Sequence, residues 1–173
     1  MIRKIISGGQ TGADRAALDF AIEIGVEHGG SIPRGRIAED GPIAQKYRLA
    51  ELSSDAYDVR TRQNVQDSDG TVLFTLAPAI RGGVKLTLEY ASQIGKPFLR
   101  IHNGNARNDL ATLTGAAELL RNFIQSNNIE ILNVAGSRES LEPGIYKFTL
   151  DLLRAFWKIG ATSSSGGNAR STL

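Results

Sequence analysis

The chain has 173 residues, of which 41% are hydrophobic and 22% charged, so disorder and collagen-like structure are excluded. It contains no cysteine, which excludes a disulfide scaffold, a zinc finger, an iron–sulfur cluster and a cysteine nucleophile. The net charge of +2 is too small to favour duplex DNA, and no apolar run approaches the ~20 residues of a membrane span.

Strand-like and helix-like segments alternate along the chain. The predicted strands are 4–7, 26–32, a short one at 57–60, 71–76, 98–102 and 129–134. The predicted helices are 12–24, 61–66, 85–94, 110–125 and 143–159, and residues 33–42 are predicted to form a loop. The first strand begins almost at the N-terminus and leaves no room for a signal peptide, so we expect a soluble, cytoplasmic protein.

This alternation predicts an α/β fold, a doubly wound three-layer sandwich with a mostly parallel, Rossmann-like sheet. The expected strand order is 2-1-3-4-5. We expect one ligand-binding domain over residues 1–160. Residues 161–173 are rich in Ser and Gly and are expected to form a flexible tail.

In such a sheet, each loop after a strand opens at the carboxyl edge, where the N-terminus of the following helix attracts anions. The first of these loops has three glycines and two polar side chains, Gly8-Gly9-Gln10-Thr11-Gly12. It matches neither the P-loop nor the dinucleotide-binding fingerprint. The pattern favours contact with a phosphate, although a glycine-rich turn with Asp14 at the helix start would also explain it.

Two further loops carry polar groups at the same edge. Ser31, Arg34 and Arg36 follow the second strand, and forked guanidinium donors suit an oxyanion; an exposed basic loop is the simpler interpretation. Thr61 and Asn64 come later, with Thr61 as an ordinary helix cap as the alternative.

A second glycine pair, Gly82-Gly83, opens the helix after the strongest strand, with Thr87 one turn later. Two glycine-opened helix N-termini across neighbouring strands can hold two parts of one anion. The fifth loop, residues 135–140, repeats the pattern more weakly and is explained by a plain turn. His28 and His102 are isolated, so structural or surface roles are expected for both.

Five ordered motifs resemble those of the molybdenum carrier family, also called molybdenum cofactor (Moco) carrier proteins. They are Gly8-Gly9-Gln10-Thr11-Gly12-Ala13-Asp14, Ser31-Ile32-Pro33-Arg34-Gly35-Arg36, Arg60-Thr61 with Asn64 to Asp69, Gly82-Gly83 to Thr87, and Lys96-Pro97-Phe98. The family is part of a Rossmann-like group related to the lonely-guy (lysine-decarboxylase-like) proteins. The likeness runs from Lys4 to about Ile159.

The resemblance implies a homotetramer that binds, stores and carries Moco without converting it, and that serves molybdenum-enzyme maturation proteins. The cargo is a pterin dithiolene with a phosphate and an oxo-molybdenum end. Its metal state (Mo, W or none) stays open, and without cysteine the chain offers it no thiolate. The predicted cofactor-binding residues are Gly8, Gly9, Gln10, Thr11, Gly12, Ser31, Arg34, Arg36, Thr61, Asn64, Gly82, Gly83 and Thr87. No catalytic or metal-ligating residue is predicted.

Two alternatives remain open. One is a nucleoside-monophosphate phosphoribohydrolase with Glu89 as acid or base. Against it, the fourth loop has Arg81, Lys85 and Leu86 where lonely-guy enzymes have proline, glycine and threonine. The other alternative is a sensor domain for a nucleotide-like ligand, which would need a second domain to receive its signal.

Overall fold

The computed structural model describes residues 2–103 and 110–164. A five-stranded parallel sheet forms the centre, in the order β2-β1-β9-β7-β8. Its strands are β1 (Lys4–Ile6), β2 (Glu27–Gly29), β7 (Gly70–Thr75), β8 (Phe98–His102) and β9 (Ile131–Gly136).

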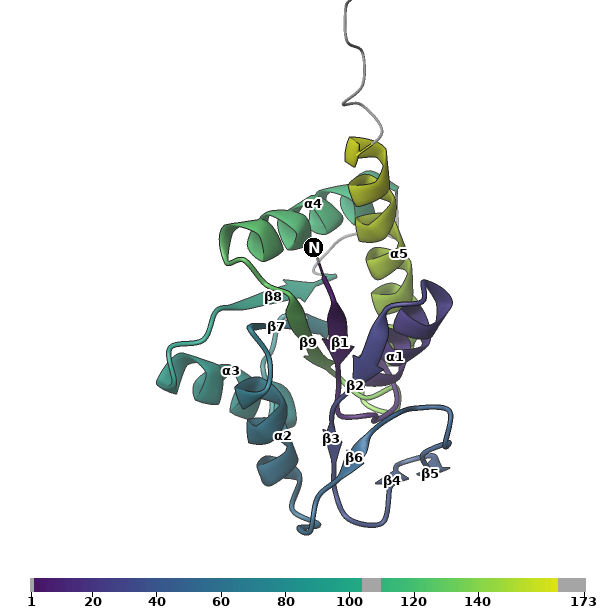
Figure 1. Cartoon of the computed structure of the whole chain (residues 1–173), viewed down its shortest axis with the longest axis vertical. Helices are drawn as coiled ribbons and strands as arrows, with labels where there is room; N and C mark the ends of the chain where they lie inside the picture. Colours follow the sequence, from purple (N-terminus) through teal and green to yellow (C-terminus); the bar gives the residue numbers. More distant parts are fainter. Residues whose placement is uncertain (1, 104–109, 165–173) are drawn as a thin grey trace, which may run out of the picture.

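Helices cover both faces of the sheet (Figure 1). They are α1 (Ala13–Glu23), α2 (Tyr57–Gln66), α3 (Gly82–Gln93), α4 (Leu110–Ser126) and α5 (Ile145–Ser164). Helix α5 packs between α1 and α4 on one face, while α2 and α3 pack together on the other. This confirms the predicted three-layer, doubly wound α/β architecture.

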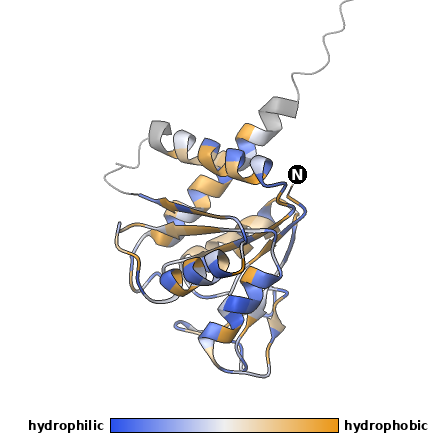
Figure 2. Ribbon diagram, turned by 90° about the vertical axis from the view of Figure 1, so that its left-hand side faces the viewer, coloured by the Kyte–Doolittle hydropathy of each residue, from blue (hydrophilic) through white to orange (hydrophobic). Residues whose placement is uncertain are grey.

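The main core lies between the sheet and the layer formed by α1, α5 and α4. Strand β7 is buried along its whole length, which explains its almost continuous apolar run. Two edge-to-face ring pairs, Phe20–Trp157 at 6.3 Å and Phe74–Phe148 at 6.4 Å between centroids, join this layer together and to β7. Figure 2 shows the strands mostly hydrophobic and the helices mixed.

Residues 31–52 leave the main sheet and form the β3–β6 segment beside α1. It contains two small two-stranded sheets, in which β3 (Ser31–Ile32) pairs with β6 (Ala50–Glu51) and β4 (Ile37–Ala38) with β5 (Gly41–Pro42). Its apolar side chains form a separate small core with one α1 residue, a cluster made up of Leu18, Ile32, Ala38, Ile43, Tyr47 and Leu49.

The strand order differs from the predicted 2-1-3-4-5. The neighbours 2-1 and 3-4 are as expected, but the fifth strand in the chain, β9, lies between β1 and β7 instead of at the edge. Counted as if the chain began at β9, the order reads 3-2-1-4-5, as in the Rossmann sheet. The prediction failed here because the order of strands along the chain does not show at which strand a doubly wound sheet begins.

Three local predictions also need correction. Residues 57–60 form the first turn of α2 and not a strand; Asp58 there complements the helix dipole. The predicted strand 26–32 splits at Gly30, which has a φ of 126° and lies so close to Ser7 that a Cβ would be 2.1 Å from its carbonyl oxygen. The loop over residues 33–42 contains the β4–β5 hairpin.

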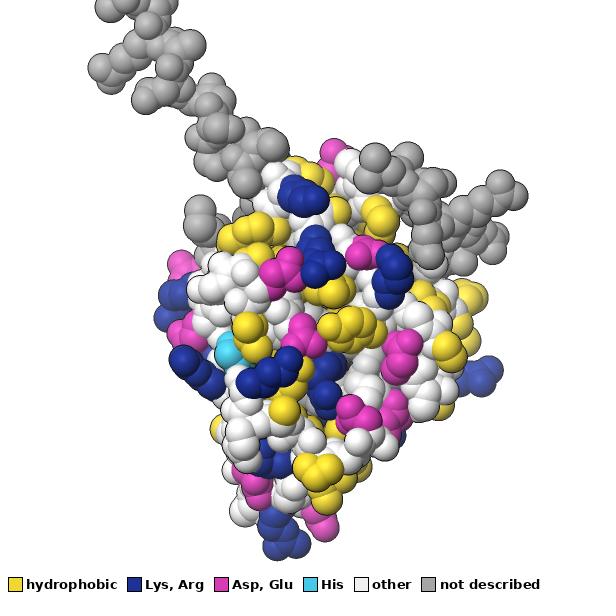
Figure 3. All heavy atoms as spheres, turned by 90° about the vertical axis from the view of Figure 1, so that its right-hand side faces the viewer, with side chains coloured by type: hydrophobic (Ala, Val, Ile, Leu, Met, Phe, Trp, Pro, Cys, Tyr) yellow, Lys and Arg dark blue, Asp and Glu magenta, His cyan; other side chains and the backbone are white. Residues whose placement is uncertain are grey.

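Helix α5 continues to Ser164, so it includes the start of the predicted tail, whose residues 165–173 lie outside the described residues. Within the described parts of the chain, no helix is long and apolar enough to cross a membrane. The face over α1, α5 and the β3–β6 segment carries basic and acidic side chains next to one another (Figure 3). Two of its ion pairs join elements, Arg154–Glu23 at 2.7 Å and Lys46–Asp19 at 2.9 Å.

Candidate functional site

A cleft of about 790 Å³ opens at the carboxyl ends of β1, β9 and β7. After β9 the chain enters α5 on one face, and after β7 it enters α3 on the other, so the cleft lies at the switch point of the sheet, where α/β proteins bind ligands. Its lining comes from β7 and β9, from the loops after these strands and after β1, and from α1, α2 and α3: Gly8, Gln10, Asp14, Tyr57, Asp58, Arg60, Thr61, Asn64, Thr75, Ala77, Ala79, Arg81, Gly82, Gly83, Val84, Leu86, Thr87, Asn133, Ala135, Gly136, Ser137, Arg138, Leu141 and Glu142.

A buried ion pair is part of this lining. Nη1 of Arg60 lies 3.2 Å from Oδ2 of Asp14, and the two side chains are only 13% and 7% exposed. Burial raises the pKa of Asp14 above its usual 3.8, while the charge and hydrogen bond of Arg60 oppose that rise. The buried Nε of Arg60 has no hydrogen-bond partner among the described residues, so Asp14 does not use all the donors of this guanidinium.

Gly8 makes room for this guanidinium. A Cβ on Gly8 would lie 1.3 Å from Nη1 of Arg60, a distance that no side chain permits. The φ of Gly8 is not in the left-handed region, so the glycine is required for the close approach of Arg60 and not for its backbone conformation.

Cations also gather around Tyr57. The guanidinium carbons of Arg60 and Arg138 lie 5.6 Å and 5.3 Å from the centre of the Tyr57 ring, within the range of cation–π attraction. No carboxylate of the described residues lies within ion-pair distance of Arg138, although its charge acts from farther away in the direction that lowers the pKa values of Asp14 and Glu39. Its guanidinium therefore has no direct acidic partner.

The N-terminus of α3 adds backbone donors. Helix α3 begins at Gly82 with Arg81 as its N-cap, and no side chain caps its first turn. Cβ atoms built on Gly82 and Gly83 meet nothing within 4 Å, which leaves space for a ligand to approach the backbone. Free N–H groups at a helix start favour an anion.

One acidic side chain already occupies backbone donors in the cleft. The Glu142 carboxylate accepts hydrogen bonds from the backbone N–H groups of Leu76 and Ala77, at 2.5 Å and 3.2 Å. These two residues follow the last residue of β7 directly. The end of this strand is thus a place where the protein itself binds an anionic oxygen pair.

Seven of the predicted site residues line the cleft: Gly8, Gln10, Thr61, Asn64, Gly82, Gly83 and Thr87. Several of their side chains also serve the fold. The side-chain amide of Asn64 accepts a hydrogen bond from the backbone N–H of Ser31 at 2.7 Å and donates one to the Ser31 carbonyl at 3.0 Å. Thr61 and Thr87 donate to backbone carbonyls one turn earlier in their own helices.

The two arginines of the second loop lie outside the cleft lining. Arg34 is largely exposed, with Asp55 3.9 Å away. Arg36 has a φ of 51° and donates to the carbonyls of Leu49, Ala44 and Tyr47 at 3.1–3.3 Å. It thereby ties the turns of the β3–β6 segment together. The contact of Arg34 and Arg36 with a ligand stays a prediction.

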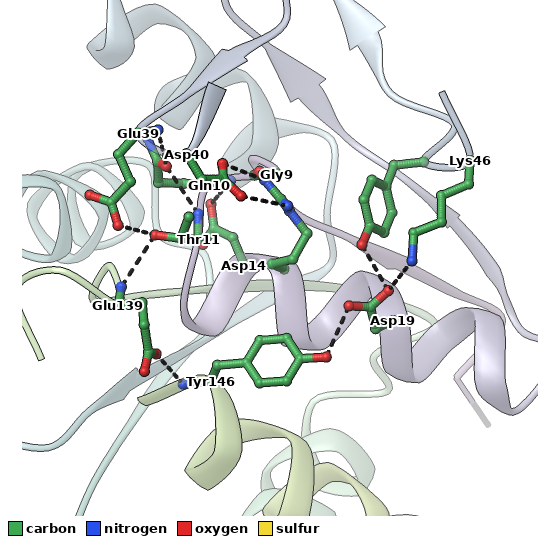
Figure 4. A network of polar contacts seen from close by, with 12 residues as sticks. Gly9, Gln10, Thr11, Asp14, Asp19, Glu39, Asp40, Lys46, Glu139 and Tyr146 are labelled. Carbon is green, nitrogen blue, oxygen red and sulfur yellow. Dashed lines mark hydrogen bonds and ion pairs between the residues drawn. The ribbon is translucent and has the colours of Figure 1, made fainter. Parts of the chain in front are cut away.

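The first glycine loop contacts the β3–β6 segment and the loop after β9 (Figure 4). Oε1 of Gln10 accepts from the backbone N–H groups of Thr11 and Glu39, and the Thr11 hydroxyl donates to the Glu39 carboxylate. The backbone N–H of Ala13 donates to the carbonyl of Ser137 at 3.2 Å, so a protein oxygen already occupies a donor at the start of α1.

Gly9 and Gly12, both with positive φ, permit close packing. Cβ atoms there would come within 2.8 Å of the Leu49 side chain and 2.4 Å of the Ser137 carbonyl. Gly9, Thr11, Gly12 and Ser31 are thus placed beside the cleft and not in its lining.

Sequence reasoning missed Tyr57, Arg138 and Glu142 as cleft residues. The sequence pattern indicates a strand at Tyr57. It indicates only a plain turn after β9, because nothing in the pattern shows that β9 is a central strand. Glu89, the acid or base of the hydrolase alternative, is exposed, faces Lys85 at 3.5 Å and does not line the cleft. Among the described residues, no group of three or more His, Asp or Glu side chains could hold a metal ion.

Comparisons with known proteins show which family this chain belongs to. Residues 5–157 match the model of the circularly permutated YpsA SLOG family. A crystal structure of a putative molybdenum carrier protein from Syntrophus aciditrophicus SB is similar, with 44% sequence identity and a TM-score of 0.84 over 90% of this chain and 94% of that one. This confirms the family resemblance seen in the motifs. No curated protein matches the chain.

Proposed function

The chain belongs to the circularly permutated YpsA SLOG family, and from this premise we propose that its cleft binds an elongated, phosphorylated anion of the molybdenum-cofactor type and carries it without chemical conversion. The observation that carries the proposal is Arg60, which Asp14 holds in the cleft lining while its buried Nε keeps no partner among the described residues. Unused donors on a largely buried guanidinium are costly, and an anionic ligand at the exposed part of Arg60 would offset that cost.

The residues of the cleft fit the charged parts of such a ligand. Arg138 and the first-turn N–H groups of α3 would hold a phosphate, because neither makes a direct contact with a carboxylate of the described residues. Tyr57 would add an aromatic ring next to two guanidinium groups. The similar protein described as a molybdenum carrier supports this ligand class.

The position of Glu89 favours binding over hydrolysis. A general acid or base must come within hydrogen-bond reach of the reacting atoms, and Glu89 is exposed on the outside of α3. We therefore place the phosphoribohydrolase second.

The test is anaerobic retention of the cofactor. The purified chain is mixed with molybdenum cofactor and desalted, and the co-eluting pterin is quantified, with excess AMP in a parallel sample. The wild-type chain should retain pterin that AMP does not displace. Arg138→Ala should weaken binding by at least about tenfold, since a hydrogen bond to a charged group contributes roughly 1.5–3 kcal/mol.

Arg34→Ala tests the second loop separately, because it removes an equally charged side chain outside the cleft lining. Weaker binding in this variant would show that the second loop also contacts the ligand, as the sequence predicts. No retention, or displacement by AMP with release of free base, would favour the nucleotide-hydrolysing alternative.

We also propose that copies of the chain associate, as the resemblance implies. Strand β8 is an edge of the sheet, and Phe98 at its start is 42% exposed. An edge strand with an exposed aromatic residue is a ready surface for pairing. The molar mass in solution, measured by light scattering, checks this proposal.

A further inference from the structure

We propose that Glu142 is an internal anion that blocks part of the cleft, and that an anionic group of the ligand displaces its carboxylate from the end of β7. The inference rests on the proposed function only in placing an anionic ligand in this same cleft. It adds how binding at this site is regulated.

The backbone at the end of β7 makes this place an anion site. Beyond Thr75, the chain leaves the ladder with β8 and β9, so the N–H groups of Leu76 and Ala77 need another acceptor. The Glu142 carboxylate supplies it, with one oxygen on each N–H group. Two adjacent backbone donors that bind a carboxylate in this way suit a phosphate oxygen equally well.

The surroundings favour a ligand anion over Glu142. Arg138 lies on the same turn, lines the same cleft and forms no direct ion pair among the described residues. The uncapped first turn of α3 lines this cleft too. An anion with more than one charge could use these donors as well as the two at the strand end, whereas Glu142 is placed on the strand-end pair alone.

The turn that carries Glu142 has a separate anchor. Glu139 accepts hydrogen bonds from the backbone N–H groups of Gly144 and Tyr146, at 2.6 Å and 3.0 Å. The backbone N–H groups of Leu141 and Glu142 both donate to the carbonyl of Arg138. These bonds hold the turn on α5 without help from the Glu142 side chain, so that side chain can move while the turn stays in place.

The experiment measures the affinity of the whole chain for inorganic pyrophosphate by calorimetry. Glu142→Gln removes the charge, and Glu142→Ala removes the competing acceptor altogether. Both variants should bind pyrophosphate at least about tenfold more tightly than the wild type, a change that corresponds to roughly 1.4 kcal/mol. Both variants should also retain more molybdenum cofactor than the wild type.

Glu139→Gln is the matched control, since it alters a carboxylate that also accepts two backbone N–H groups on the same turn, but outside the cleft lining. It should lower the melting temperature and leave pyrophosphate affinity unchanged. Unchanged or weaker binding by both folded Glu142 variants would overturn the inference, because it would mean that Glu142 contacts the ligand or has only a structural role. Tighter pyrophosphate binding without any cofactor retention would support the inference and contradict the proposed function.

Discussion

Gly8 and Arg60 show how single residues define the cleft. The guanidinium occupies the space that any side chain at position 8 would fill, and its ion pair with Asp14 is nearly closed to solvent. Breaking a buried ion pair by removing one partner leaves an uncompensated charge, which costs far more than the loss of an exposed pair. A small change at position 8 should therefore act through Arg60, which is far away in the sequence but lies directly against Gly8 in the fold.

We predict that Gly8→Ala pushes Arg60 away from Asp14. The chain should still fold, because the obstructed atoms are the end of a flexible side chain, but with a loss of about 1–3 kcal/mol of stability. Pyrophosphate binding should weaken. Both effects are measured by urea unfolding and calorimetry.

The double-mutant cycle with Arg60→Ala is the control for this interpretation. With Arg60 removed, most of the effect of Gly8→Ala should disappear, since the two residues are coupled. Additive effects would show that the alanine strains the backbone directly instead.

At the scale of elements, Asp19 of α1 joins three parts of the molecule. Its carboxylate accepts from Lys46 and Tyr47 of the β3–β6 segment and from Tyr146 of α5 (Figure 4). Burial alone would raise the pKa of Asp19, but these hydrogen bonds outweigh it and lower the pKa below the usual 3.8. Burial and Asp19 raise the pKa of Tyr146 to about 12. The cluster thus stabilises the fold only while Asp19 is ionised and Tyr146 is protonated.

We predict a corresponding loss of stability at both extremes of pH. Because the folded pKa of Asp19 is lowered, its contribution is present above pH 3.8 and is lost as the pH falls through the folded value. Because that of Tyr146 is raised, its contribution is present below pH 10 and is lost as the pH rises towards 12. Urea midpoints between pH 3 and 6 should depend less on pH in Asp19→Asn than in the wild type. An unchanged slope would exclude Asp19 as a source of the acid sensitivity.

The sequence predicted most of the helices and strands, but not the β3–β6 segment or the ion pair in the cleft. Strand β7 and helices α3 and α4 were found because long periodic runs report burial directly. The β3–β6 segment escaped prediction because it packs through scattered residues and through Arg36, whose backbone-capping role has no local pattern. The structure has a cleft at the edge of the sheet where the sequence predicts the site, and Gly8 and Gly82-Gly83 line it. Its ion pair was missed because Asp14 and Arg60 lie 46 positions apart.

At the scale of the whole molecule, the position of β9 explains the site. The family description, circularly permutated, agrees with a sheet whose order becomes 3-2-1-4-5 when counted from β9. The crevice between β9 and β7 is then the switch point of an ordinary doubly wound sheet. This is where the cleft lies.

We predict that a rearranged chain beginning just before β9 keeps the fold and the cleft. The new ends would lie at Asn127–Asn128, in the turn after α4, and a flexible linker would join the end of α5 to residue 2. Every strand and the loop directly after each strand would stay intact, so pyrophosphate affinity should match that of the natural chain, as measured by calorimetry. A chain opened inside β9 is the control and should not fold. Loss of the cleft in the first chain would show that the natural order is required.

The central place of β9 also affects how the protein is made. A ribosome releases β1, β2, β7 and β8 first, and until residues 131–136 emerge no strand can join the two halves of the sheet. During that interval β1 and β7 each have an unpaired, largely apolar edge, which is a risk for aggregation in a nascent chain. Folding of the sheet, and with it assembly of the cleft, is therefore delayed until residues 131–136 have emerged from the ribosome.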